Sequence, residues 1–113
     1  MMQNSDVLRK AHVYVQNIKA GILCETDEGY SFTYDASYLA GSNPSVSITL
    51  PLRPEPYTSS VLFPFFDGLI PEGWLLNLVS RNWKIDRKDR FGLLLASCFD
   101  CIGDVSIRPE EYE

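Results

Sequence analysis

The first half of the chain alternates between apolar and polar residues with a period of two. Ala11, Val13 and Val15 share one face of the first such segment, and His12 and Tyr14 share the other. Because successive side chains of a strand point to opposite faces, this pattern predicts a half-buried strand from Ala11. Similar alternation predicts further antiparallel strands at residues 22–24, 30–34, 46–50 and 104–108.

Short polar connections separate these segments. Residues 17–21 and 27–29 have the composition of hairpin-length turns. Asp35 is a suitable N-cap for a short helical turn at residues 36–40, which Gly41 would end. Three prolines between Pro51 and Tyr57 predict an irregular connection or a sheet edge.

The second half of the chain changes to a helical period. Leu75, Val79 and Trp83 fall on one arc of a helix predicted near residues 73–84. Asp86 and Asp89 stand three residues apart, which is the spacing of a capping box, and predict the start of a helix near residues 87–98. We therefore predict an α+β fold, with a small curved antiparallel sheet packed with two or three helices.

Length and composition predict one globular domain. The chain has 113 residues, of which 45% are hydrophobic and 22% are charged. We expect a flexible lead-in at residues 1–10, one domain at residues 11–109 and an acidic tail at residues 110–113. No apolar run approaches the roughly 20 residues of a membrane span, and the polar amino terminus lacks a signal-peptide pattern. We expect no membrane association and a cytoplasmic location.

Charge limits the classes of partner. A formal net charge of −5 argues against direct binding of nucleic acid, which needs a basic face. Five basic residues nevertheless fall within ten positions, namely Arg81, Lys84, Arg87, Lys88 and Arg90. They form either a solvated connection between two helices or a docking patch for an acidic partner surface.

Candidate chemistry is sparse. Cys98 and Cys101 have the spacing of a redox or metal motif, but a closed zinc site needs four ligands, and Cys24 and His12 are the only other soft candidates. Two thiols around a helix-to-strand turn are the simpler interpretation. The sequence has no phosphate-binding glycine motif and no nucleophile–base pattern. We therefore expect no catalytic residue, no metal site, no cofactor and no enzymatic activity.

The aromatic stretch at residues 63–76 is the most distinctive segment. Its prolines and glycines predict a tight corner, in which the phenylalanines at positions 63, 65 and 66 are core residues. Trp74 lies opposite the core arc of the following helix, beside Asn77 and Arg81. Its indole either bends back over the Pro71 corner or is offered to a partner. If it is offered to a partner, the candidate partner-binding residues are Trp74, Pro71, Glu72, Gly73, Asn77 and Arg81.

Four segments resemble one protein family. The chain from about residue 12 to Pro109 is similar to the amino-terminal subdomain of HipA-type serine/threonine kinase toxins, and the Phe-Phe-x-x-Leu-x-Pro-Glu-Gly element is specific to it. The segments that carry the resemblance are Tyr30–Leu39, Ile48–Leu52, Phe65–Trp74 and Asp100–Gly103. In such kinases the catalytic and ATP-binding motifs lie downstream of this subdomain.

The resemblance also extends to the HipS family of small antitoxins from tripartite HipB–HipS–HipT systems. It implies a bacterial antitoxin that binds and neutralises a HipT-like kinase directly, within a ternary complex that also contains a HipB-like helix-turn-helix repressor. An alternative is a split-off structural subdomain that completes the kinase without blocking it. A thiol oxidoreductase using Cys98 and Cys101 is the enzyme-class alternative. Such an enzyme should lose its activity on Cys98→Ser, whereas an antitoxin with the same substitution should still protect cells.

Overall fold

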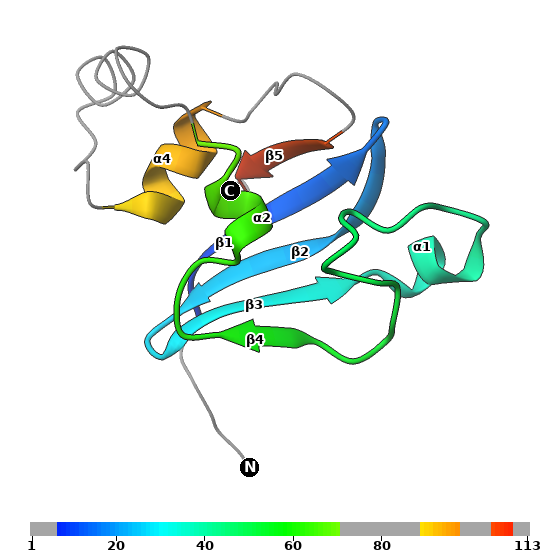
Figure 1. Ribbon diagram of the computed structural model, residues 1–113, viewed down its shortest axis with the longest axis horizontal. Helices are drawn as coiled ribbons and strands as arrows, with labels where there is room; N and C mark the ends of the chain where they lie inside the picture. Colours follow the sequence, from blue (N-terminus) through cyan, green and yellow to red (C-terminus); the bar gives the residue numbers. More distant parts are fainter. Residues whose placement is uncertain (1–6, 71–88, 98–104, 110–113) are drawn as a thin grey trace, which may run out of the picture.

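The computed structural model describes residues 7–70, 89–97 and 105–109, and it has the predicted α+β fold. A single antiparallel sheet has the strand order β4-β3-β2-β1-β5. Figure 1 shows the short helices α2 and α4 close together at β1 and β5, with α1 at the other end of the sheet. The elements are β1 (Val7–Val15), β2 (Ile18–Thr26), β3 (Gly29–Tyr34), α1 (Ala36–Ala40), β4 (Tyr57–Ser59), α2 (Pro64–Asp67), α4 (Arg90–Ser97) and β5 (Val105–Pro109).

The first hairpin has a shorter turn and a longer second strand than the sequence predicted. Gln16 and Asn17 form its turn with φ values of 52° and 69°. Positive φ at both central residues matches the twist of the flanking strands, as in type I′ hairpins. The second strand therefore starts at Ile18, so the prediction of a turn over residues 17–21 was wrong beyond Asn17.

The first strand also starts earlier than predicted. β1 begins at Val7, and its residues from Val7 onward pair with β2. Residues 7–10 therefore belong to the sheet and not to a flexible lead-in. Arg9 in this part of the strand lies opposite Glu25 of β2.

The predicted strand at residues 46–50 is a turn. Ser47 and Leu50 form an isolated bridge, and the Leu50 amide donates to the Ser47 carbonyl at 3.0 Å. The fourth strand is instead β4, which pairs with β3 at the edge of the sheet and has only three residues. The expectation of an edge near the three prolines is thus correct, although the strand follows them.

The core lies between the inner face of the sheet and the helices α2 and α4. Ala11, Val13 and Val15 of β1 are buried, as the alternation predicted. Phe32 of β3 contacts Phe66 of α2 with ring centroids 5.6 Å apart. The rest of the core includes Leu23, Tyr34, Phe63, Ile70, Phe91, Leu93, Leu94 and Ile107.

The helix boundaries follow local chemistry. Pro64 occupies the first turn of α2, where its missing amide hydrogen costs nothing. Asp89 caps α4, because its Oδ1 accepts from the Gly92 amide at 3.1 Å. This helix spans Arg90–Ser97, within the predicted range of 87–98. The helix predicted at 73–84 lies outside the described residues.

Two tyrosines hold the loop after α1 against the sheet. The Tyr34 hydroxyl accepts from the Val46 amide at 2.9 Å and donates to the Leu50 carbonyl. The Tyr38 hydroxyl donates to the Pro44 carbonyl at 2.6 Å. Burial raises the pKa of Tyr34, which keeps its hydroxyl protonated and able to donate.

We predict that Tyr34→Phe destabilises the fold by about 2 kcal/mol, because the Val46 amide and the Leu50 carbonyl both lose a buried partner. Urea unfolding followed by circular dichroism measures this change. Tyr57→Phe is the matched control, since the Tyr57 hydroxyl bonds the Pro51 carbonyl in an exposed position. Equal destabilisation by both substitutions would contradict this account of Tyr34.

Candidate functional site

The predicted partner-binding residues lie outside the described part of the chain. These are Pro71, Glu72, Gly73, Trp74, Asn77 and Arg81. The structure instead shows the chain on both sides of them, up to Ile70 after α2 and again from Asp89 before α4. Ile70 is buried, and Asp89 is held by polar contacts. The described residues that flank these positions are thus a buried residue on one side and an ion-paired residue on the other.

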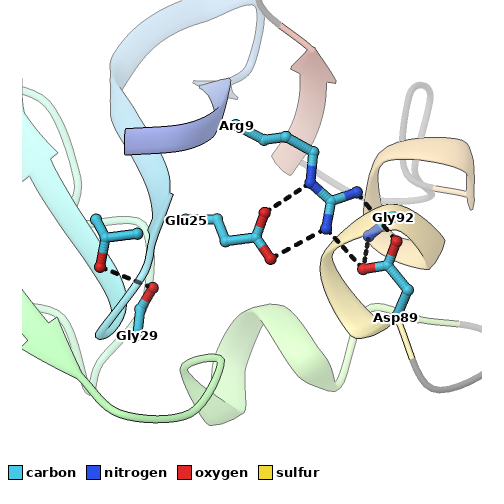
Figure 2. Close-up of polar contacts among 6 residues, drawn as sticks. Arg9, Glu25, Gly29, Asp89 and Gly92 are labelled. Carbon is cyan, nitrogen blue, oxygen red and sulfur yellow. Dashed lines mark hydrogen bonds and ion pairs between the residues drawn. The ribbon is translucent and has the colours of Figure 1, made fainter. Parts of the chain in front are cut away.

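Arg9 donates four hydrogen bonds to the carboxylates of Glu25 and Asp89. Its Nε and Nη2 atoms donate to the two carboxylate oxygens of Glu25 at 2.6 and 3.0 Å. Its Nη1 and Nη2 atoms donate to the two carboxylate oxygens of Asp89 at 3.0 and 2.7 Å. Figure 2 shows the guanidinium between the two carboxylates. One planar guanidinium thus binds two carboxylates bidentately, a geometry that lysine cannot reproduce.

Strand register and helix capping bring these three residues together. Arg9 has the same parity as Ala11 and Val13, so it lies on the face of β1 that the helices cover. The register places Glu25 directly opposite it on β2. The guanidinium carbon also lies 5.1 Å from the centroid of the buried Phe91 ring in α4.

The electrostatics favour the ionised forms of Arg9 and Asp89. Hydrogen bonds to Glu25 and then to Asp89 raise the pKa of Arg9 above its ordinary value. The hydrogen bond from Arg9 lowers the pKa of Asp89, and the Gly92 amide adds to this shift. These shifts of Arg9 and Asp89 are those of a structural ion-pair network.

Gly92 allows this close approach. A Cβ atom at this position would lie 2.4 Å from the Asp89 Oδ2 atom and 3.2 Å from the Arg9 Nη1 atom. Any side chain would therefore displace the carboxylate that caps α4 and binds Arg9.

A second ion pair joins the two helices. The Nε atom of Arg90, at the start of α4, donates to the Oδ1 atom of Asp67, at the end of α2, at 2.7 Å. Arg90 belongs to the basic stretch identified in the sequence; the other four members lie outside the described residues. We refer to Arg9, Glu25, Asp67, Asp89 and Arg90 as the ion-pair cluster.

The opposite face of the sheet carries a shallow groove. Thr26, Ser31, Thr33 and Thr58 line it from β2, β3 and β4, with Glu28 at one end. Ser31 and Thr33 alternate along β3 with the core residue Phe32 and therefore point away from the helices. None of the five residues of the ion-pair cluster lines this groove, although Tyr30, whose ring lies 6.1 Å from that of Phe91, does.

The metal and redox candidates lie only partly within the described ranges. Cys24 is half-buried on β2 and His12 is half-buried on β1. No group of three or more potential ligands occurs in the described part of the chain. Cys98 and Cys101 lie outside it. None of the helices described is long and apolar enough to cross a membrane.

Known proteins share this architecture. Residues 11–108 match the family described as the HipA N-terminal domain. A solved structure of the N-terminal domain of HipA toxin is 30% identical, with a TM-score of 0.74, and the match covers 96% of this chain and 98% of that one. An uncharacterized protein from Haemophilus influenzae is 32% identical over 106 residues, which cover 94% of this chain and 97% of the relative.

The fold and the matches define a module of the kind found at the amino terminus of HipA toxins. This chain belongs to the HipA N-terminal domain family. It is therefore a HipA-like component related to toxin–antitoxin systems, and the matched region includes no kinase catalytic domain. The resemblance inferred from the sequence is confirmed at this level.

Sequence reasoning missed most of the ion-pair cluster. Arg9 was assigned to a lead-in, and Glu25 and Asp67 were given no role. The alternation Arg9, Ala11, Val13 contained a signal, because extending it by one step places a charged side chain on the core face. A charge on that face needs a partner, but the sequence could not identify which carboxylate supplies it.

We predict that Arg9→Gln destabilises the fold by about 2 kcal/mol, because the carboxylates of Glu25 and Asp89 then face each other without a cation. Chemical denaturation measures the change. Lys19→Gln is the control, since Lys19 and Asp35 are 3.7 Å apart and partly exposed. An Arg9→Gln effect no larger than that of the control would show that the network contributes little.

The stabilising effect of the Asp89 charge should depend on pH. The folded-state pKa of Asp89 is below its ordinary value of 3.8, so its ionised form stabilises the fold above that pH, and this contribution is lost as pH falls through the lowered pKa. The stability difference between wild type and Asp89→Asn should be constant from about pH 7 to 5 and shrink below about pH 4. Urea titrations at several pH values test this. A difference that grows on acidification would contradict it.

Proposed function

We propose that this chain is a HipS-like antitoxin that binds a HipT-like serine/threonine kinase and neutralises it. The observation that carries this proposal is the match over 96% of this chain to the N-terminal domain of HipA toxin. The described part of the module has its own core, in which Phe32, Phe66 and Phe91 are fully buried. A module with such a core can dock as a preformed unit onto a kinase that lacks its own copy.

The other partners follow from the same proposal. A HipB-like helix-turn-helix repressor would supply the contacts to DNA within a ternary complex. The net charge of −5 supports this division, because the chain itself lacks the excess of basic residues that phosphate contacts require. The complex would act in the cytoplasm, with no cofactor bound to this chain.

The proposed anchor of the interface is Trp74. In the sequence it follows Pro71, Glu72 and Gly73, and Asn77 and Arg81 share its side of the predicted helix. Tryptophan is the residue type most enriched at binding hot spots. Insertion of this aromatic side chain near the active site of the kinase would exclude the substrate or block the active arrangement.

A structural role is the alternative function. The similarity to a domain of HipA toxin itself favours this role, since a split-off copy could complete the kinase fold without inhibiting it. A phosphorylation assay of the kinase with and without this chain separates the two functions. Inhibition supports the antitoxin, whereas unchanged or increased activity together with a higher melting temperature of the kinase supports the structural role.

We predict that Trp74→Ala weakens binding to the kinase by at least about 2 kcal/mol, while the chain keeps its own melting temperature. Isothermal titration calorimetry against the kinase measures the first quantity, and thermal unfolding measures the second. Trp83→Ala is the control, because Trp83 lies on the predicted core arc and its loss should destabilise the fold by roughly 3–5 kcal/mol. If Trp74→Ala folds normally and inhibits as well as wild type, Trp74 is not the anchor.

A further inference from the structure

The turn at Ser47–Leu50 exposes one large aliphatic side chain almost completely. Ile48, the second residue of this turn, is 94% exposed, more than any other large hydrophobic residue that the structure describes. Val46 and Leu50, on either side of it, are buried. The turn is therefore seated on the core, while the Ile48 side chain adds almost nothing to that core.

Hydrogen bonds from side chains hold this turn in one conformation. The Tyr34 hydroxyl bonds backbone groups on both sides of Ile48. Within the turn, the Ser47 hydroxyl accepts from the Thr49 amide at 3.2 Å, and the Ser47 carbonyl accepts from the Leu50 amide at 3.0 Å. The backbone that carries Ile48 is thus fixed before any partner binds.

The segment that follows the turn is also exposed and also held in place. Every residue from 51 to 56 is exposed, and Leu52 is 39% exposed. The Tyr57 hydroxyl donates to the Pro51 carbonyl at 2.6 Å, and the Arg53 guanidinium carbon lies 3.7 Å from the centroid of the Tyr57 ring. The Nε and Nη2 atoms of Arg53 donate to two carbonyls of the same segment. Pro51 and Leu52 are therefore exposed on an ordered loop.

Packing within the chain does not account for the family resemblance of this segment. Ile48–Leu52 is one of the four segments that resemble HipA-type domains, yet only Leu50 of its five residues is buried. The exposed aliphatic side chains gain free energy only when another molecule removes them from water. The solved relative is the N-terminal domain of HipA toxin, so a module of this kind adjoins the rest of a toxin. The kinase of the proposed function is therefore the partner that we expect to cover this segment.

We propose that Ile48, with its exposed neighbours Pro51 and Leu52, forms an apolar docking surface for the kinase, in addition to Trp74. We refer to these three exposed residues of the loop as the Ile48 surface. The inference rests on the proposed function for the identity of the partner, but not for inhibition, because an antitoxin and a structural subunit would both use such a surface. The matching surface of the kinase is an apolar pocket that accepts an aliphatic side chain. Because the loop is already ordered, little backbone entropy is lost when it docks.

Ile48→Ser tests this surface with little risk to the fold. A side chain that is 94% exposed loses few contacts on truncation, so the melting temperature should stay unchanged. Leu8→Ser is the matched control, since Leu8 is an isomeric aliphatic residue that is 55% exposed. It lies near the start of β1, at the end of the sheet opposite to Tyr34. Ile48→Val keeps a branched aliphatic side chain, and Ile48→Glu replaces it with a charge.

The test measures binding of each variant to a HipA-type kinase of the same genome that lacks this subdomain, using surface plasmon resonance. We expect Ile48→Ser to raise Kd by about tenfold or more, mainly through faster dissociation, because the burial of the isoleucine side chain is lost. Ile48→Glu should raise Kd further, since a carboxylate would enter an apolar pocket without a partner. Ile48→Val and Leu8→Ser should bind within about twofold of the wild type. Sedimentation velocity of the isolated chain, with and without Ile48→Ser, shows whether the same surface joins two copies.

Failure of the Ile48 surface and failure of the proposed function give different results. If the wild type binds the kinase and Ile48→Ser has the same Kd, only the Ile48 surface is wrong. If Ile48→Ser weakens binding but the wild-type complex phosphorylates its substrate normally, the surface stands and the antitoxin role is wrong. If the wild type does not bind the kinase, both are wrong.

Two further results would overturn the Ile48 surface. An equal loss of affinity with Leu8→Ser would assign the effect to any exposed aliphatic residue and not to this loop. A wild-type dimer that Ile48→Ser dissociates would make a second copy of this chain the occupant in place of the kinase.

Discussion

The bidentate binding of two carboxylates by the single guanidinium of Arg9 is the contact on which the orientation of α4 against the sheet depends. It joins neighbouring strands through Glu25 and fixes the first turn of α4 through Asp89. A charge this close to a core is costly unless its donors are paired, and here hydrogen bonds to the two carboxylates use four of the five N–H donors. Asp89 serves twice, because the carboxylate that binds Arg9 also caps the helix.

Ion pairs and hydrogen bonds fix the orientation of the helices in this fold, which apolar packing alone leaves undetermined. Burial of Phe66 and Phe91 is roughly proportional to area and has little directionality, so it holds α2 and α4 on the sheet without fixing their rotation. The ion pairs depend on distance and angle and therefore select one arrangement. Gly92 permits this arrangement, because a Cβ atom at its position would collide with Asp89. Tyr34 plays a comparable role at the other end of the sheet, where its hydroxyl fixes the loop through Val46 and Leu50.

Local patterns in the sequence predicted local structure well and predicted long-range pairing poorly. The strands around Val13 and Phe32 were recognisable because burial of one face produces alternation within a few residues. The same alternation occurs in the turn at Ser47–Leu50, where only Val46 and Leu50 are buried and Ile48 is exposed, so the pattern alone could not distinguish a turn from a strand. Arg9 and Asp89 are 80 positions apart, and no sequence period links residues at such a separation. The predicted site at Trp74 came from composition and resemblance, and the ion pairs on either side of it are visible only in three dimensions.

The difference between buried apolar packing and exposed ion pairs determines which substitutions a HipA N-terminal domain tolerates. The core residues that maintain the fold lie between the helices and the sheet, whereas Asp67 and Arg90 are partly exposed at the helix ends. Substitutions at the exposed ends cost little stability, because surface ion pairs contribute little to folding. Substitutions at these two positions can therefore leave the sheet and its core intact.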